Sequence, residues 1–299
     1  MTENNDFKSG FVAIIGRPNV GKSTVLNYLV GEKIAIVTDK PETTRDKIQG
    51  VLTRDDAQVI FVDTPGIHKP INLLGKRITR LAKDSFLESD VIVFIIDLTR
   101  GITKEDRLIF DLIKEIKKPV ILLLNKVDLV SKSLALPLIE EASRVRDFNE
   151  IIPTSATKGD NMGILLDKII ENLPRGPKYF SDDQLTDKTE RFMAGEIVRE
   201  KALEFTREEV PHSVAVLVDE FKKRPGKKLF YIRATIFIER HSQKKILVGH
   251  KGQMLKSIGE SARKDIEEFL GKRAYLDLWV KVYENWRKDP NALRMLGYM

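Results

Sequence analysis

The chain has 299 residues and no cysteine, with 42% hydrophobic and 32% charged residues and a formal net charge of +7. This composition is typical of a globular protein of about two domains, and it excludes a disulfide framework and a thiolate metal site. No apolar run reaches the roughly 20 residues of a membrane span and the N-terminal residues lack a signal-peptide pattern, so we expect a cytoplasmic protein.

Residues 1–173 are expected to form a first domain, because apolar runs alternate there with amphipathic segments such as 104–118. Each apolar run ends in polar residues or glycine, as expected for buried strands of a parallel sheet. The predicted strands are FVAIIG (11–16), AQVIFVDTPG (57–66), VIVFIIDLT (91–99), PVILLLNKVD (119–128) and EIIPTSA (150–156). The pattern predicts an α/β domain that binds ligands beyond the carboxyl ends of its strands.

The first predicted strand leads into GRPNVGKST, which matches the pattern G-x-x-x-x-G-K-[ST]. In such a loop, backbone N–H groups surround phosphate oxygens, Lys22 contacts the β and γ phosphates, and the Ser23 hydroxyl ligates Mg²⁺. The sequence therefore predicts a nucleotide triphosphate site. Its loop residues are Gly16, Arg17, Pro18, Asn19, Val20, Gly21, Lys22, Ser23 and Thr24.

The segment NKVD, residues 125–128, follows another buried strand and points to guanine as the base. The Asp128 carboxylate can accept hydrogen bonds from the N1–H and the exocyclic amine of guanine, and adenine offers no such pair of donors. We expect Asn125 to brace the loops and Lys126 to lie along the base. Ser155 and Ala156, after the next strand, complete the predicted base site.

The ordered set GRPNVGKS, TTRD, DTPG, NKVD and SA resembles the translation-factor-related GTPases. Together with VGHKGQM (248–254) in a basic C-terminal part, it makes the whole chain similar to the bacterial Era family of GTPases. The resemblance implies hydrolysis of GTP to GDP and phosphate. It also implies that Thr44 ligates Mg²⁺ as the switch threonine, with Thr43 as the alternative.

The same resemblance gives roles to the segment DTPG. Asp63 is expected to hold a Mg²⁺-bound water, and the Gly66 N–H is expected to sense the γ-phosphate, with Thr64 and Pro65 beside them. The predicted catalytic residues are thus Lys22, Thr44, Gly66 and Asn19, and the metal ligands are Ser23, Thr44 and Asp63.

Ile67 follows Gly66 where Ras-like enzymes have a glutamine that positions water. Isoleucine cannot do this, so hydrolysis is expected to be slow in the isolated chain and to use backbone groups, another residue or a partner. His68 is more simply an exposed loop residue than a base. In related GTPases an asparagine at the position of Asn19 helps to hold K⁺, which can replace an arginine finger, although a turn residue after Pro18 explains it equally well.

Residues 174–190 show neither the helical nor the strand periodicity and are expected to be a linker. Residues 191–299 are expected to form a second domain. Residues from Arg191 onward include 23 Lys and Arg against 15 Asp and Glu, a balance of +8. The patterns predict a helix over 191–210, strands over 212–223 and 227–240, then two helices with an amphipathic one over 256–271, and a strand over 274–286. This order resembles a type II KH domain, so the basic excess points to RNA.

The segment VGHKGQM would be the KH loop that clamps about four single-stranded nucleotides. Gly249 and Gly252 allow close approach of the backbone, and His250, Lys251 and Lys256 supply donors and charge. Ile246, Val248 and Ile258 would form an apolar floor under the bases. A turn between two helices is the alternative for the loop, and packing is the simpler role for Trp279 and Trp286.

By resemblance, the RNA is 16S ribosomal RNA of the small subunit near its 3′ end, and the role is 30S maturation under control of the bound GTP or GDP. A constitutive RNA-binding protein with a structural nucleotide is the competing hypothesis. A nucleotide-dependent RNA-modifying enzyme is less favoured, because no methyl-donor motif is present. We expect a monomer; peripheral association with the inner face of the cell membrane would fit the basic surface, but no amphipathic segment argues for it.

Overall fold

The computed structural model describes residues 6–40, 43–67, 72–131, 135–208, 210–224 and 229–298. They divide into two compact units. The first unit contains the described residues up to Ala35, from Thr44 to Ile67 and from Arg77 to Asp187; the second contains those from Ile36 to Thr43, from Asn72 to Lys76 and from Lys188 onward. Within the described ranges, no helix combines the length and apolar character that crossing a membrane requires.

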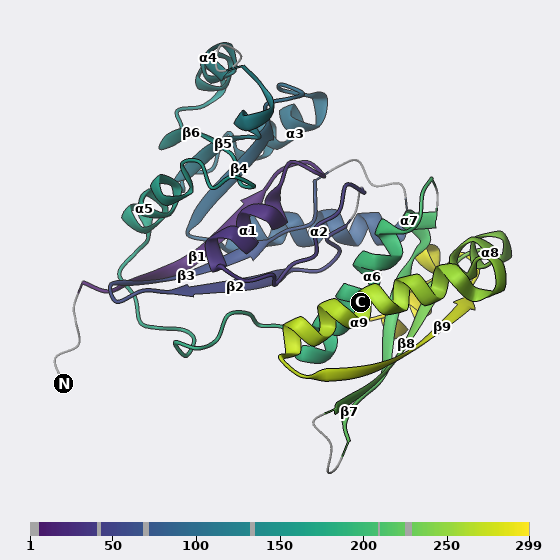
Figure 1. Cartoon of the computed structure of the whole chain (residues 1–299). Helices are drawn as coiled ribbons and strands as arrows, with labels where there is room; N and C mark the ends of the chain where they lie inside the picture. The colour runs from purple at the N-terminus through teal and green to yellow at the C-terminus, as the bar shows by residue number, and fades with distance from the viewer. Residues whose placement is uncertain are drawn as a thin grey trace. The chain divides into compact units, whose positions relative to one another are not determined.

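The first unit is built on a six-stranded sheet in the order β2-β3-β1-β4-β5-β6 (Figure 1). β2 runs antiparallel to β3, and the other neighbouring strands are parallel. The mostly parallel sheet confirms the predicted α/β class, and β2 is a strand that the sequence patterns did not reveal. The strands are β1 (Lys8–Ile15), β2 (Ile48–Thr53), β3 (Ala57–Asp63), β4 (Val91–Asp97), β5 (Val120–Asn125) and β6 (Glu150–Thr154).

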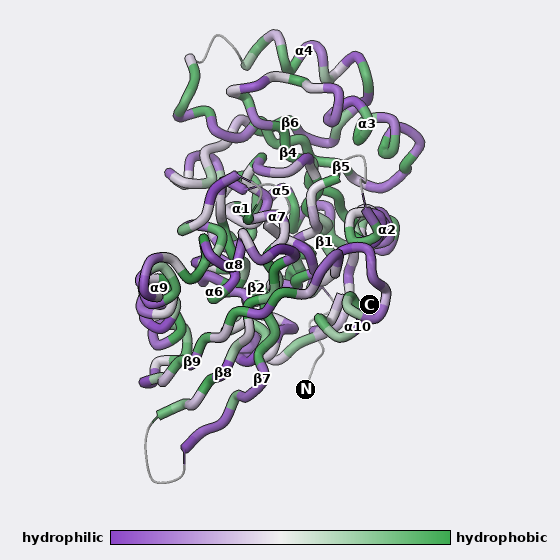
Figure 2. Tube along the Cα trace, turned by 90° about the vertical axis from the view of Figure 1, so that its right-hand side faces the viewer, coloured by the Kyte–Doolittle hydropathy of each residue, from purple (hydrophilic) through white to green (hydrophobic). Residues whose placement is uncertain are grey.

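Helices bury this sheet on both faces, which explains why β4 and β5 are apolar up to their last residues, Asp97 and Asn125. Figure 2 shows mostly hydrophobic residues in this part of the sheet. One face packs against α2, α3 and α4 around Phe94 and Phe110, while α1 and α5 contact β1. The helices are α1 (Lys22–Val30), α2 (Leu73–Glu88), α3 (Lys104–Ile113), α4 (Ala135–Val145) and α5 (Met162–Asn172), with a 3-10 turn η1 (Val127–Leu129).

Residues 174–187, part of the predicted linker, are hydrogen-bonded to β2 and β3. The Val51 N–H donates to the Leu185 carbonyl at 2.9 Å, and the Gln49 N–H donates to Asp187 Oδ1 at 2.9 Å. The Gln58 amide donates to the Phe180 carbonyl at 2.9 Å. This segment therefore groups with the first unit, and the chain enters the second unit at Lys188.

The second unit has the element order predicted for a KH domain. Its three-stranded sheet has the order β7-β8-β9, with β7 antiparallel and β9 parallel to β8. Ile232, Ala234 and Ile236 of β8 are fully buried in a core shared with the helices. The elements are α6 (Glu190–Glu204), α7 (Val210–Ser213), β7 (Ala215–Lys223), β8 (Leu229–Ile238), α8 (His241–Val248), η3 (His250–Gly252), α9 (Gln253–Leu270), β9 (Arg273–Val282), η4 (Trp286–Lys288) and α10 (Pro290–Met295).

The two tryptophans have different environments. Trp286 is fully buried, stacks on Tyr298 and donates its indole N–H to the Ser213 carbonyl at 2.9 Å. Trp279 lies on the edge strand β9 and is 55% exposed, so it is at the edge of the protein and not in its core.

Candidate functional site

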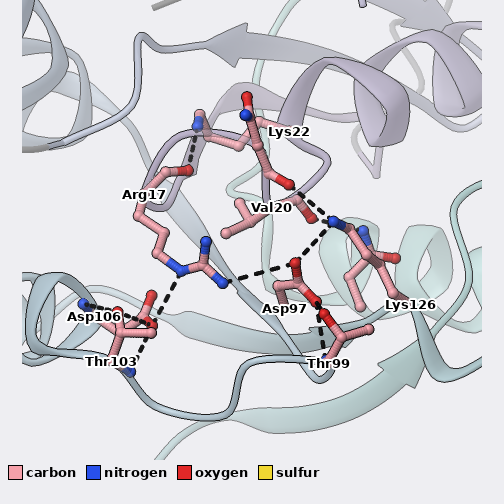
Figure 3. Close-up of polar contacts among 10 residues, drawn as sticks. Arg17, Val20, Lys22, Asp97, Thr99, Thr103, Asp106 and Lys126 are labelled. Carbon is pink, nitrogen blue, oxygen red and sulfur yellow. Dashed lines mark hydrogen bonds and ion pairs between the residues drawn. The ribbon is translucent and has the colours of Figure 1, made fainter. Parts of the chain in front are cut away.

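The loop between β1 and α1 holds the predicted phosphate-binding residues. Lys22 is buried and its ammonium donates to the carbonyl oxygens of Gly16 at 3.2 Å and Arg17 at 2.9 Å (Figure 3). Val20 is buried beneath the loop, Pro18 and Thr24 are half-buried, and Asn19 is exposed. The ammonium thus lies against the same loop whose N–H groups are expected to bind phosphate oxygens.

Burial lowers the pKa of Lys22 from 10.5 to about 8. The Arg17 charge acts in the same direction, whereas Asp63 and Asp106 oppose it. An anionic ligand would stabilise the charged form of Lys22. Its phosphate oxygens would replace the favourable interactions with water that the ammonium loses on burial.

Three oxygen-bearing side chains converge at the start of α1. Ser23 Oγ donates to Asp63 Oδ2 at 2.7 Å and lies 3.1 Å from Thr44 Oγ1, and Thr44 Oγ1 donates to the same carboxylate oxygen at 3.4 Å. Asp63 is fully buried, burial raises its pKa, and its Oδ1 atom has no hydrogen-bond partner. Two hydroxyls and an unsatisfied carboxylate oxygen match the hard oxygen donors that Mg²⁺ prefers.

This cluster is not a protein-only metal cage. Among the described residues, no group of three or more His, Cys, Asp or Glu side chains could hold a metal ion. Mg²⁺ is usually bound by one or two protein ligands together with substrate phosphates, and the arrangement here fits that mode.

The geometry distinguishes the two candidate switch threonines. Thr44 reaches Ser23 and Asp63, as described above. Thr43 Oγ1 instead donates to the Lys40 carbonyl at 2.6 Å and lies 2.7 Å from Thr38 Oγ1. Thr44 is therefore the threonine placed beside the candidate Mg²⁺ ligands.

Asn125, at the end of β5, joins three loops. Its amide Nδ2 donates to the Val20 carbonyl at 2.8 Å, and its Oδ1 accepts from the Ala156 N–H at 3.1 Å. A Cβ atom on Gly21 would lie 2.4 Å from Asn125 Nδ2, so only glycine leaves room for this contact. The phosphate loop and the loop after β6 are thus braced by one side chain.

The next residues form the candidate base site. Lys126 has a positive φ of 69°, and its ammonium donates to the Asn19 carbonyl at 3.0 Å. Asp128, in η1, is exposed. Ser155 is fully buried, and its Oγ accepts from the Lys158 N–H at 3.2 Å, which fixes the loop that carries Ala156.

The segment after β3 runs beside the phosphate loop. Thr64 donates to the Ile14 carbonyl at 2.8 Å, and the Ile67 N–H donates to the Gly16 carbonyl at 3.2 Å, with buried Pro65 and Gly66 between them. The Ile67 side chain is 4% exposed and packs in the core with α2 and α3. It is therefore unable to position a water, and His68 lies outside the described residues.

The loop VGHKGQM joins α8 to α9. Gly249 has φ 71°, and a Cβ atom there would lie 2.7 Å from Met254 Cβ. His250 and Lys251 are exposed at the tip, and Ile246 is 50% exposed. Val248 is half-buried against the core, whereas Ile258 is fully buried within it. Ile258 therefore cannot contribute to an apolar floor, and that expectation is wrong.

A groove begins at this loop and continues between α9 and β9. Besides the predicted Lys256, it contains Gly259 and Arg263 of α9, which the motif search missed although they follow Gly252 at helical spacing. The sheet edge of β9 contributes Tyr275, which is 55% exposed. The lining residues are Gly252, Leu255, Lys256, Gly259, Glu260, Arg263, Tyr275, Leu276 and Leu278.

Comparison with known proteins agrees with this division into two kinds of site. Residues 11–126 match the family model of 50S ribosome-binding GTPases, and residues 209–287 match that of the KH domain. A crystal structure of a variant of Era from Aquifex aeolicus bound to GDP·AlF4⁻ is 44% identical in sequence and has a TM-score of 0.94; the match covers 98% of this chain and 99% of that one.

A second structure contains Era in complex with MgGDPNP and nucleotides 1506–1542 of 16S ribosomal RNA. It is also 44% identical, with a TM-score of 0.95 and the same coverage of both chains. This chain belongs to the Era family of GTPases. It is accordingly an enzyme that hydrolyses GTP to GDP and phosphate, followed by a KH domain, and the family predicted from its motifs is confirmed.

Proposed function

We propose that this Era-family GTPase uses its nucleotide state to control how its KH domain binds 16S ribosomal RNA near the 3′ end, and that it acts in 30S subunit maturation. The RNA is inferred from the Era complex with nucleotides 1506–1542. In this proposal residues 1–173 form the GTPase domain, 174–190 the connection and 191–299 the RNA-binding domain.

The proposed nucleotide site contains the phosphate loop, Lys22 and the base loops around Asn125. Ser23, Thr44 and Asp63 would hold Mg²⁺, which neutralises phosphate charge when it is bound. Lys22 contacts the β and γ phosphates, and Asp128 accepts from the guanine edge. Because Ile67 is buried, the attacking water is positioned by backbone groups, another side chain or a partner.

The observation that carries the switching part of the proposal concerns the segment Ile36–Thr43. This segment groups with the second unit, and the next residue, Thr44, belongs to the candidate metal cluster of the first. Arg199 of α6 donates to the Thr43 carbonyl, and the Val37 N–H donates to Glu200 Oε1 at 2.9 Å. Thr44 is adjacent in the chain to Thr43, which is hydrogen-bonded to α6. A change at Thr44 would therefore reach a residue that contacts this helix.

The RNA site would be the loop between α8 and α9 with the groove beyond it. His250 and Lys251 are exposed beside backbone that can approach phosphate closely, and Lys256 and Arg263 line the groove. Exposed Tyr275 offers a face on which a base could stack. This is the combination of charge and flat apolar surface that single-stranded RNA requires.

The test is the affinity of the full chain for RNA of nucleotides 1506–1542, measured with GDPNP and with GDP at one salt concentration. We expect a difference of roughly tenfold, or about 1.4 kcal/mol of coupling. Equal and tight binding in both states would favour constitutive RNA binding, and no binding in either state would overturn the proposal.

The same samples test a finer proposal, that Asn19 helps to hold an activating K⁺. Its exposed position at the tip of the loop supports this role, although its positive φ of 63° also suits asparagine as a turn residue. Faster GTP hydrolysis in KCl than in NaCl is expected, and equal rates would leave Asn19 as a turn residue.

A further inference from the structure

Asp97 is a buried carboxylate that none of the nucleotide-binding motifs contains. It is the last residue of β4 and lies opposite Asn125 in the register of β4 with β5. Its side chain is 3% exposed. A buried carboxylate is costly unless its oxygens accept hydrogen bonds or form ion pairs. The partners of Asp97 therefore indicate its role.

Both oxygens of Asp97 have partners (Figure 3). Oδ1 accepts from the Thr99 N–H at 3.0 Å and from its hydroxyl at 2.6 Å, and Oδ2 accepts from the Lys126 ammonium at 2.8 Å. Burial alone would raise the pKa of Asp97, but the hydrogen bonds from Lys126 and Thr99 hold it below the ordinary value. Thr99 fixes the carboxylate so that its other oxygen faces Lys126.

Lys126 is held by two chain segments at once. Besides Asp97, its ammonium binds the Asn19 carbonyl of the phosphate loop, and its backbone has the positive φ described above. Its side chain is 31% exposed, so without these two contacts it would have several rotamers available. Both contacts are made by the protein's own chain, and a side chain fixed in this way is preorganised for a ligand.

A second cation extends the cluster into the phosphate loop. The Arg17 side chain is 9% exposed and lies between two carboxylates, with its guanidinium 3.7 Å from Asp97 and 3.4 Å from Asp106. Asp106 is fully buried and accepts from the Thr103 N–H at 2.9 Å and from its hydroxyl at 2.8 Å at the start of α3. Two cations and two carboxylates thus join the phosphate loop to β4, α3 and the base loop.

We propose that Asp97 is a positioning residue for guanine nucleotide binding, which holds Lys126 in the orientation needed along the base and, through Arg17, links the base loop to the phosphate loop. The inference rests on the GTPase activity of the family and on the base site proposed above. It does not depend on the RNA or on switching.

The test uses the full chain and the release of a fluorescent GDP analogue. Asp97→Asn keeps the shape of the side chain but removes the negative charge that binds Lys126. The lost hydrogen bond is one to a charged group, and partial exposure of Lys126 reduces its contribution, so we expect release to become roughly tenfold faster. Glu141→Gln is the matched control, since it neutralises a carboxylate in an exposed ion pair with Arg107.

A double-mutant cycle separates positioning from a general structural effect. If Asp97 acts through Lys126, Asp97→Asn should add little to the faster release caused by Lys126→Met. Binding of inorganic tripolyphosphate, which has no base, should change less than binding of GDP. Additive effects of the two substitutions, an equal loss of tripolyphosphate binding, or unchanged GDP release in a folded Asp97→Asn protein would each overturn the inference.

Failure of this test is distinguishable from failure of the proposed function. Asp97→Asn leaves the residues of the RNA groove untouched, so RNA affinity at saturating nucleotide should not change. If neither GDP nor GTP bound to the unaltered chain, the base site itself would be wrong, and the positioning role of Asp97 would be overturned with it.

Discussion

The charge of Lys22 depends on whether phosphate lies next to it. Its pKa of about 8 results first from burial, and the neighbouring Arg17 lowers it further. Near neutral pH the ammonium is mostly charged, and a bound polyphosphate would raise the pKa again. Nucleotide binding must therefore be linked to proton uptake at a pH above the ligand-free value.

This linkage predicts how nucleotide affinity varies with pH. Above about pH 8 the ligand-free chain loses the Lys22 proton while the bound chain keeps it, so affinity for GDP should fall by up to about tenfold per pH unit. Below that pH Lys22 is charged in both states, and its contribution should be flat. Calorimetry in buffers of different ionisation enthalpy should detect uptake of close to one proton at pH 9 and almost none from Lys22 at pH 7. Absence of uptake at the higher pH would contradict the role of Lys22.

Sequence patterns locate single residues well when a motif fixes their spacing. The phosphate-loop residues and Asn125 are local to a strand end, and periodicity gives the strand. The choice between Thr43 and Thr44 is different, because adjacent residues differ only in which way each hydroxyl points. Asp97 and Asp106 were missed for a related reason: Arg17 lies 80 and 89 positions before them, and only the sheet brings them together.

At the scale of the element, α9 connects the predicted RNA loop to the groove. The helix begins after Gly252, with φ 81°, and ends before Gly271, with φ 60°. A Cβ atom at either glycine would meet nothing within 4 Å. The glycines at the two ends of α9 therefore have similar backbone conformations and similar room for a side chain. Only Gly252 lies beside His250 and Lys251.

We expect Gly252→Asp to weaken RNA binding at least roughly tenfold, because a carboxylate would face the RNA phosphates in the loop and cancel part of its positive charge. GTP binding should be unchanged. Filter binding with the RNA fragment and a nucleotide-binding assay measure the two effects.

Gly271→Asp is the matched control, with the same new charge and similar backbone strain at the far end of α9. Melting of both variants reports the cost of the left-handed conformation, which should be about 1 kcal/mol in each. If the two variants lost RNA affinity equally, the loop between α8 and α9 would not be the RNA-binding loop.

Element prediction failed where the sequence shows no clear period. β2 contains Gly50 and shows little alternation, and its position at the sheet edge is defined by pairing with β3. Residues 174–187 have no periodicity at all, yet they are hydrogen-bonded to β2 and β3. Their contacts are set by the sheet they pass, which the local composition does not encode.

At the scale of the whole molecule, the chain crosses between its two units next to Thr44, the proposed switch threonine. Arg199 is fully buried in α6, ion-paired with Glu196, and donates to the Thr43 carbonyl. Its neighbour Glu200 accepts from the Val37 N–H. Coupling between nucleotide and RNA needs a contact that differs between the two states, and these bonds are candidates for it.

Arg199→Met should therefore reduce the coupling between nucleotide state and RNA binding. It removes the donor to Thr43 but keeps an apolar stem in the buried position. We expect the roughly tenfold ratio of RNA affinities with GDPNP and GDP to shrink to about two, while affinity in the GDP state stays the same. Glu204→Gln, which alters a more exposed ion pair with Lys201 on the same helix, is the control and should keep the full ratio. A folded Arg199→Met protein that also kept the full ratio would show that coupling takes another route, because the bond from α6 to Thr43 would then be present without influencing RNA affinity.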